Sequence, residues 1–117
     1  MEFIEAPAFT RYLPDYLSDD LYKELQAYLI INPEGGDIMQ GTGGFRKLRW
    51  SDSRRGKGKR GGLRVIYFLF EEDEQIWLMT IYDKSEADDL TPIQKKALKE
   101  VLDIEKLARA KQRKARR

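Results

Sequence analysis

Residues 62–70, GLRVIYFLF, constrain the fold more than any other segment of the chain. From residue 63 onward every residue except Arg64 is apolar, so a strand formed here would be apolar on both faces. Such a strand belongs at the centre of a sheet, where both of its faces are covered. Residues 71–74, EEDE, predict an acidic turn, and residues 75–84, QIWLMTIYDK, predict the returning strand of a hairpin.

The N-terminal third of the chain predicts one short strand and two helices. Residues 2–6, EFIEA, alternate in polarity as a strand does. Pro7 suits the first turn of a helix that Pro14 limits to about two turns. Ser18 is the expected N-cap of a second helix, which Pro33 ends. The apolar stripe of that second helix comprises Leu21, Tyr22, Leu25, Tyr28 and Leu29.

The alternation typical of strands returns after the second helix and then gives way to a final helix. Residues 37–41 and 42–50 predict two short strands, and Thr91 with Gln94 predicts a capping box at the start of the helix. Beyond Leu107 the apolar stripe of this helix fades, and we expect order to fade with it. Six of its apolar residues are expected to pack on the sheet: Ile93, Ala97, Leu98, Val101, Leu102 and Ile104.

The predicted order of elements is strand, two helices, four strands and helix. This order indicates a single α+β domain over residues 1–107, in which helices pack on one curved antiparallel sheet. Residues 108–117 form a basic C-terminal tail that we expect to be partly disordered.

Positive charge is concentrated in two segments, although the net charge is only +2. Residues 42–64 contain nine basic residues and one acidic residue, and residues 106–117 contain seven basic residues and no acidic one. This segregation predicts a polyanionic partner. The alternative is that the first segment is a solvated loop and the second a solvated tail.

The residue types present exclude several kinds of chemistry. The chain has no His for an imidazole acid–base pair and no Cys for a disulfide or a thiolate metal site. The absence of Cys fits a reducing cytosol, and no apolar run reaches the ~18 residues of a membrane span, so we expect a cytoplasmic protein without a membrane partner. Residues 41–44, GTGG, lack the ending of a phosphate-binding loop and predict a turn. Four carboxylates could hold a metal, although a solvated loop before a helix is the simpler explanation: Asp83, Glu86, Asp88 and Asp89.

Basic residues from separate strands are expected to converge at one edge of the sheet. Alternation in the strand FRKLRW places Lys47 and Arg49 on the same face. The hairpin brings the start of one strand close to the end of the next, so Arg64 should lie near Tyr82 and Lys84. The alternative for Arg64 is a structural ion pair with a nearby carboxylate, because an arginine entering a central strand needs a partner.

This set of residues could cleave RNA without a metal or another cofactor. The ribose 2′-hydroxyl would attack the adjacent phosphate, and fixed guanidinium groups would stabilise the charge that gathers on the phosphate oxygens. A lysine crowded by other cations can act as the base, and Tyr82 could stack on a nucleobase or position the hydroxyl. Further contacts with RNA phosphates are expected from Arg46, Arg54, Arg55, Lys57, Lys59 and Arg60.

The chain resembles toxins of the RelE/ParE superfamily, and most closely their HigB-type branch. The likeness is carried by three segments in order: GTGGFRKLRW, GKGKRGGLRVIYF and LMTIYDKSEADDL. It implies a fold similar to that of microbial ribonucleases and an endonuclease that cuts mRNA in the A site of the 30S ribosomal subunit, beside ribosomal RNA. It also implies a cognate helix-turn-helix antitoxin of the HigA type, through which alone the toxin would act at operator DNA.

The resemblance also implies roles for individual residues. Lys47 and Arg49 match the two basic residues of the family's first active-site strand, and Arg64 matches the arginine that contacts the scissile phosphate. Lys84 falls where a further basic residue, often proposed as the general acid, lies in the family. The tyrosine that follows this position in the best understood relative has no counterpart in the stretch EADDL, and Tyr82 is the candidate to replace it.

Two other functions remain open from the sequence. ParE-type toxins share the fold but poison DNA gyrase and lack the nuclease residues, so the basic set Lys47, Arg49 and Arg64 argues against that branch. A non-catalytic module that binds RNA or the ribosome is the third possibility, because a basic sheet binds phosphates whether or not it cuts them.

Overall fold

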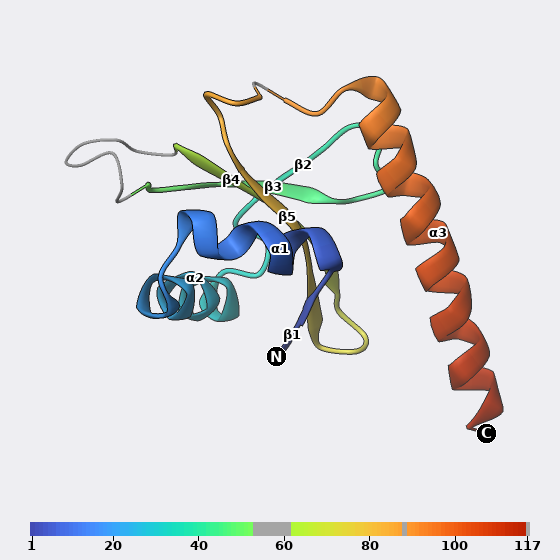
Figure 1. Cartoon of the computed structure of the whole chain (residues 1–117). Coiled ribbons are helices and arrows are strands. Elements are labelled where there is room, and N and C mark those ends of the chain that lie inside the picture. The colour runs from blue at the N-terminus through green and yellow to red at the C-terminus, as the bar shows by residue number, and fades with distance from the viewer. Residues whose placement is uncertain (53–61, 88, 117) are drawn as a thin grey trace.

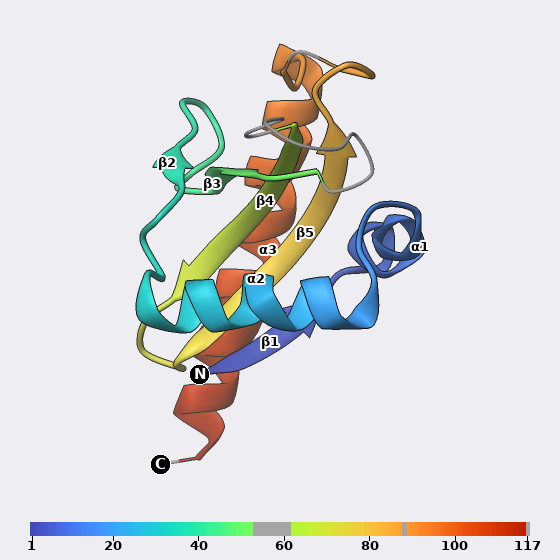
Figure 2. The same cartoon turned by 90° about the vertical axis from the view of Figure 1, so that its left-hand side faces the viewer.

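The computed structural model describes residues 1–52, 62–87 and 89–116, and its elements follow the expected order. Helices α1 (Pro7–Tyr16) and α2 (Asp19–Ile31) lie on one face of the sheet, and α3 (Pro92–Ala115) lies on the other (Figures 1 and 2). This arrangement confirms the prediction of an α+β fold. The strands of the described residues are β1 (Glu2–Glu5), β2 (Asp37–Ile38), β3 (Arg46–Trp50), β4 (Leu63–Phe70) and β5 (Gln75–Asp83).

The strands form one mixed sheet with the order β1-β5-β4-β3-β2, so β4 lies at its centre as predicted. β4 pairs antiparallel with both β3 and β5. β1 runs parallel to β5, and the expectation of an antiparallel sheet throughout is wrong at this edge. No hairpin sets the direction of this pair, because β1 is followed by two helices and its partner comes late in the chain.

Helices α1 and α2 form one core layer against the odd-numbered residues of β4. Phe9 of α1 and Leu25 of α2 are fully buried in the same cluster as Val65. The N-cap of α2 is confirmed, because the Ser18 hydroxyl accepts a hydrogen bond from the backbone N–H of Leu21 at 3.2 Å. These contacts leave the even-numbered residues of β4 to face α3.

Helix α3 contacts the sheet along a narrow line. Leu102 is buried and Leu98 is half-buried, whereas Ile93 and Ile104 are 82% and 70% exposed. The prediction that all six apolar residues pack on the sheet is therefore wrong. At 3.6 residues per turn, Ile93 and Ile104 lie on the side of the helix opposite Leu102. Two more residues of the set are also exposed, Ala97 and Val101.

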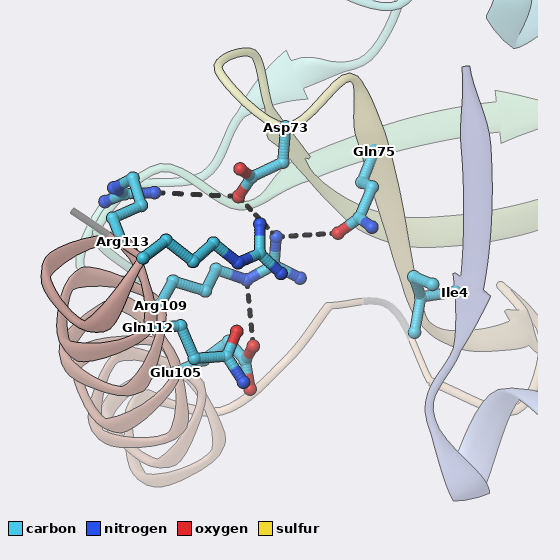
Figure 3. A pocket seen from close by; sticks show the side chains of 8 residues that line it. Ile4, Asp73, Gln75, Glu105, Arg109, Gln112 and Arg113 are labelled. Atoms are coloured by element: carbon cyan, nitrogen blue, oxygen red, sulfur yellow. Dashed lines mark hydrogen bonds and ion pairs between the residues drawn. The ribbon is translucent and has the colours of Figure 1, made fainter.

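Both ends of α3 are held by side-chain contacts. At its start Thr91 and Gln94 form the predicted capping box. Near its end the Arg109 guanidinium lies 3.7 Å from the centre of the Phe70 ring, and its Nη1 lies 2.7 Å from a carboxylate oxygen of Asp73 (Figure 3). These contacts stabilise a helix that continues through residue 115, beyond the point where order was expected to fade.

Candidate nucleic-acid interface

Three side chains form a row across three neighbouring strands at one end of the sheet. Arg49 of β3 pairs with Arg64 of β4, and Arg64 pairs with Tyr82 of β5. Residues paired in this way point to the same face, with β-carbons about 4.5–5.5 Å apart. Lys47 lies two positions before Arg49 and shares that face, which is the face that α3 covers. The structure therefore brings together four of the five residues predicted to be catalytic.

The two arginines of this row differ in exposure. Arg64 is 8% exposed, and its Nη1 donates to the backbone oxygen of Leu63 at 3.1 Å, whereas Arg49 is exposed. Two cations directly opposite each other on paired strands repel. An anion that contacts both guanidinium groups would offset this repulsion, so the row favours an anionic ligand.

Tyr82 supplies an uncharged hydroxyl at the β5 end of the row. Its Oη is buried and forms no hydrogen bond with any described residue. Burial raises the pKa of Tyr82 above its ordinary value, and the charge of Asp89 raises it further, while Arg64 lowers it. The hydroxyl therefore stays protonated at neutral pH, as a proton donor must.

Asp89 links the row to the start of α3. Its Oδ1 lies 3.4 Å from Nζ of Lys47, and its Oδ2 lies 3.5 Å from Nζ of Lys95. Burial opposes ionisation of Asp89, but the backbone N–H of Leu90 and the two lysines outweigh it and hold the pKa of Asp89 below its ordinary value. The carboxylate thus lies between two cations, which are groups that also bind phosphate oxygens.

Lys95 is a residue of this site that the sequence pattern did not predict. It lies in the first turn of α3, where the helix dipole disfavours a cation. That unfavourable position is a signal that could have drawn attention to it. Its proximity to Asp89 depends on how α3 docks on the sheet, which no local pattern predicts.

The other predicted residues are not members of the row, and five of them lie outside the described part of the chain. Arg46 points to the opposite face of β3, where its Nη1 donates to the backbone oxygens of Gly36 at 2.9 Å and Glu34 at 3.3 Å. Lys84 is exposed in the turn after β5, and its backbone N–H donates to the oxygen of Gly62. Five residues predicted to bind RNA lie outside the described residues: Arg54, Arg55, Lys57, Lys59 and Arg60.

The carboxylates before α3 are engaged separately. Asp83 is buried and accepts a hydrogen bond from the backbone N–H of Ser85, and Glu86 accepts one from the Tyr16 hydroxyl at 2.8 Å. Asp88 lies outside the described residues. Within residues 1–52, 62–87 and 89–116, no three acidic side chains are grouped so that they could hold a metal ion.

A hollow of about 380 Å³ lies near the C-terminal end of α3, away from the row (Figure 3). Four of its charged side chains bind one another. Arg109 Nη1 lies 2.7 Å from Asp73 and 2.6 Å from the Gln75 side-chain oxygen, and Arg113 Nη1 lies 3.7 Å from Asp73. These contacts attach α3 to the turn between β4 and β5.

No protein-family model matches the chain. In the described part of the molecule, none of the helices combines the length and the apolar character needed to cross a membrane. A functional assignment therefore depends on the chemistry of the row and on the resemblance carried by the sequence.

Proposed function

We propose that the chain is the toxin of a toxin–antitoxin pair, a HigB-type, ribosome-dependent endoribonuclease of the RelE/ParE superfamily. One observation carries the proposal: Arg49, Arg64 and Tyr82 lie in direct register on one face of the sheet, with Lys47 beside them. The sequence resemblance supplies the substrate, mRNA in the ribosomal A site, and the partner, a helix-turn-helix antitoxin.

Each group has a task in cleavage by the RNA's own 2′-hydroxyl. The 2′ oxygen bonds to phosphorus and the bond from phosphorus to the 5′ oxygen breaks, which leaves a cyclic phosphate and a free 5′-hydroxyl. The 2′ proton passes to a basic group, for which Lys84 is the candidate, and the leaving oxygen takes a proton from Tyr82. Arg49 and Arg64 stabilise the negative charge of the phosphate oxygens in the transition state.

The hydroxyl of Tyr82 is the feature that distinguishes a nuclease from a module that only binds phosphates. A module that only binds phosphates needs the guanidinium groups of Arg49 and Arg64, but it gains little from a buried hydroxyl that has no partner among the described residues. A nuclease needs a proton donor at this position in the transition state. This difference favours cleavage over binding alone.

Primer extension on mRNA from cells that express the protein tests the proposal. The wild-type protein should produce breaks within translated frames, and Arg49→Ala should abolish them. Arg49 is exposed, so its replacement should leave the fold intact, which circular dichroism can verify. Arg11→Ala removes the same charge from the exposed surface of α1 and should leave the breaks unchanged.

Three outcomes would point elsewhere. Supercoiling defects without mRNA breaks would favour a gyrase poison of the ParE type. Association with ribosomes without any breaks would favour a non-catalytic binding module. Breaks that persist when translation initiation is blocked would contradict action in the A site.

A further inference from the structure

Asp89 holds two lysines that come from different layers of the molecule. Lys47 belongs to β3 and Lys95 to α3, and the carboxylate bridges their Nζ atoms at 3.4 and 3.5 Å. Both separations exceed the roughly 2.7–2.9 Å of a strong charge-assisted hydrogen bond. The Asp89 side chain is also 45% exposed. The bridge is therefore long and open to solvent, so another anion can displace the carboxylate.

The bridge lies beside the row and affects the positive charge that this face of the sheet offers to RNA. Lys47 shares its face with Arg49 and Arg64, so a phosphate held by the arginines would lie beside Lys47. While Asp89 is bound, it neutralises charge that this face would otherwise offer to RNA. The oxygen that contacts Lys47, Oδ1, also accepts a hydrogen bond from the backbone N–H of Leu90, which is 2.8 Å long.

We propose that Asp89 competes with the substrate phosphate for Lys47 and Lys95, and that Lys95 is a phosphate-binding residue of the site. The inference rests on the proposed function. It adds Lys95 of α3 as a phosphate-binding residue and Asp89 as a group of the chain itself that competes with the phosphate. In the free protein the carboxylate keeps both ammonium groups in place. When RNA binds, a phosphate oxygen takes the position between them and the carboxylate turns toward solvent.

A purely structural bridge and a competitor predict different results for Asp89→Asn. Either way the substitution leaves two lysines facing each other, so the melting temperature should fall by about 2 °C. A structural bridge predicts no gain in RNA affinity. A competitor predicts that the same variant binds RNA more tightly while it is less stable.

The test measures binding by fluorescence anisotropy, with a labelled single-stranded RNA whose 2′ oxygens are methylated so that it cannot be cut. Asp89→Asn should bind about three- to tenfold more tightly than wild type, and Lys95→Gln should bind more weakly by a similar factor. Loss of the Lys95 contact should also reduce the slope of log affinity against log salt by about 0.7.

Two matched controls lie in α3, the helix that contains Lys95. Asp103→Asn removes an equal charge from a carboxylate that lies 3.4 Å from Lys99 on the exposed surface. Lys96→Gln removes an equal charge from the exposed residue next to Lys95. Each control should change the RNA affinity by less than about twofold, because at such positions only long-range charge is altered.

The outcomes separate this inference from the function on which it rests. If wild type binds the RNA but Asp89→Asn binds no more tightly than Asp103→Asn, the competitor is contradicted and the proposed function stands. If Lys95→Gln behaves like Lys96→Gln, the role of Lys95 is contradicted. If wild type binds neither this RNA nor ribosomes at low salt, both the inference and the proposed function are wrong.

Discussion

Arg49 and Arg64 face each other across β3 and β4, two cations in direct register on the same face of the sheet. The pairing of the strands fixes their backbones, so the two side chains stay close although their charges repel. An anion that contacts both guanidinium groups would offset this repulsion and stabilise the folded protein. The row is therefore expected to couple folding to anion binding.

Inorganic pyrophosphate should raise the melting temperature of the wild-type protein. A ligand present at 100 times its dissociation constant stabilises the folded state by about 2.7 kcal/mol. Arg49→Ala should reduce this shift, and without ligand its melting temperature should be unchanged or higher, because the repulsion with Arg64 is gone. Differential scanning fluorimetry at constant ionic strength measures both effects, with Arg11→Ala as the control. An equal shift in Arg49→Ala and wild type would show that the anion binds elsewhere.

Tyr82→Phe should slow RNA cleavage strongly without lowering stability. The buried Oη has no hydrogen-bond partner among the described residues, so its removal leaves no described group unpaired. Single-turnover cleavage of ribosome-bound mRNA should slow by roughly 10²- to 10⁴-fold, the usual contribution of an acid or base. Urea unfolding should give an unchanged or higher free energy. Tyr12→Phe, on the exposed surface of α1, should cleave normally, and normal cleavage by Tyr82→Phe would exclude this hydroxyl as the acid.

Asp89 should make stability depend on pH in the acid range. Its pKa in the folded protein lies below the ordinary value of 3.8, so folding favours the ionised form. This contribution is present above that ordinary value and is lost as the pH falls through the folded pKa. The difference in unfolding free energy between wild type and Asp89→Asn should therefore shrink as the pH is lowered from about 6 to about 2. A difference that stays constant over this range would contradict the assignment.

Two nearby apolar residues of α3 should respond very differently to truncation. Leu102 is fully buried, so Leu102→Ala should lower the free energy of unfolding by about 2–5 kcal/mol. Ile104 points away from the sheet, so Ile104→Ala should change it by no more than about 0.5 kcal/mol. Chemical denaturation of both variants measures the contrast. Equal losses would mean that the outer face of α3 is covered in solution.

Local patterns were sufficient to predict the features that depend on neighbouring residues. The apolar run of residues 62–70 predicts a central strand, and Ser18 and Thr91 mark the helix starts that the structure confirms. A short acidic turn joins β4 and β5 and brings the start of β4 near the end of β5, but the pairing of Arg64 with Tyr82 also needs the register shift between Ile66 and Tyr67, which no local pattern predicts. Alternation also separates Arg46 from Lys47, although charge alone groups them together.

Features that depend on docking between distant segments could not be predicted in this way. The parallel pairing of β1 requires the chain to return after two helices, and the bridge from Asp89 to Lys47 and Lys95 requires α3 to settle at one position on the sheet. The same docking decides that Leu102 faces the sheet and Ile104 faces water. The apolar pattern of α3 alone predicted that Ile104 packs on the sheet, which is wrong.

The attachment of Arg109 to Phe70 and Asp73 has a consequence for the opposite end of the helix. A straight helix moves as a rigid rod, and Lys95 and Arg109 are 14 residues apart along it, or about 21 Å. A fusion, a proteolytic cut or a bound partner that pulls Arg109 away would tilt this rod about its Leu102 contact. Because Lys95 lies on the other side of that pivot, the tilt would change its distance from Lys47, so the basic end of the chain helps to set the spacing of charges at the row from a distance.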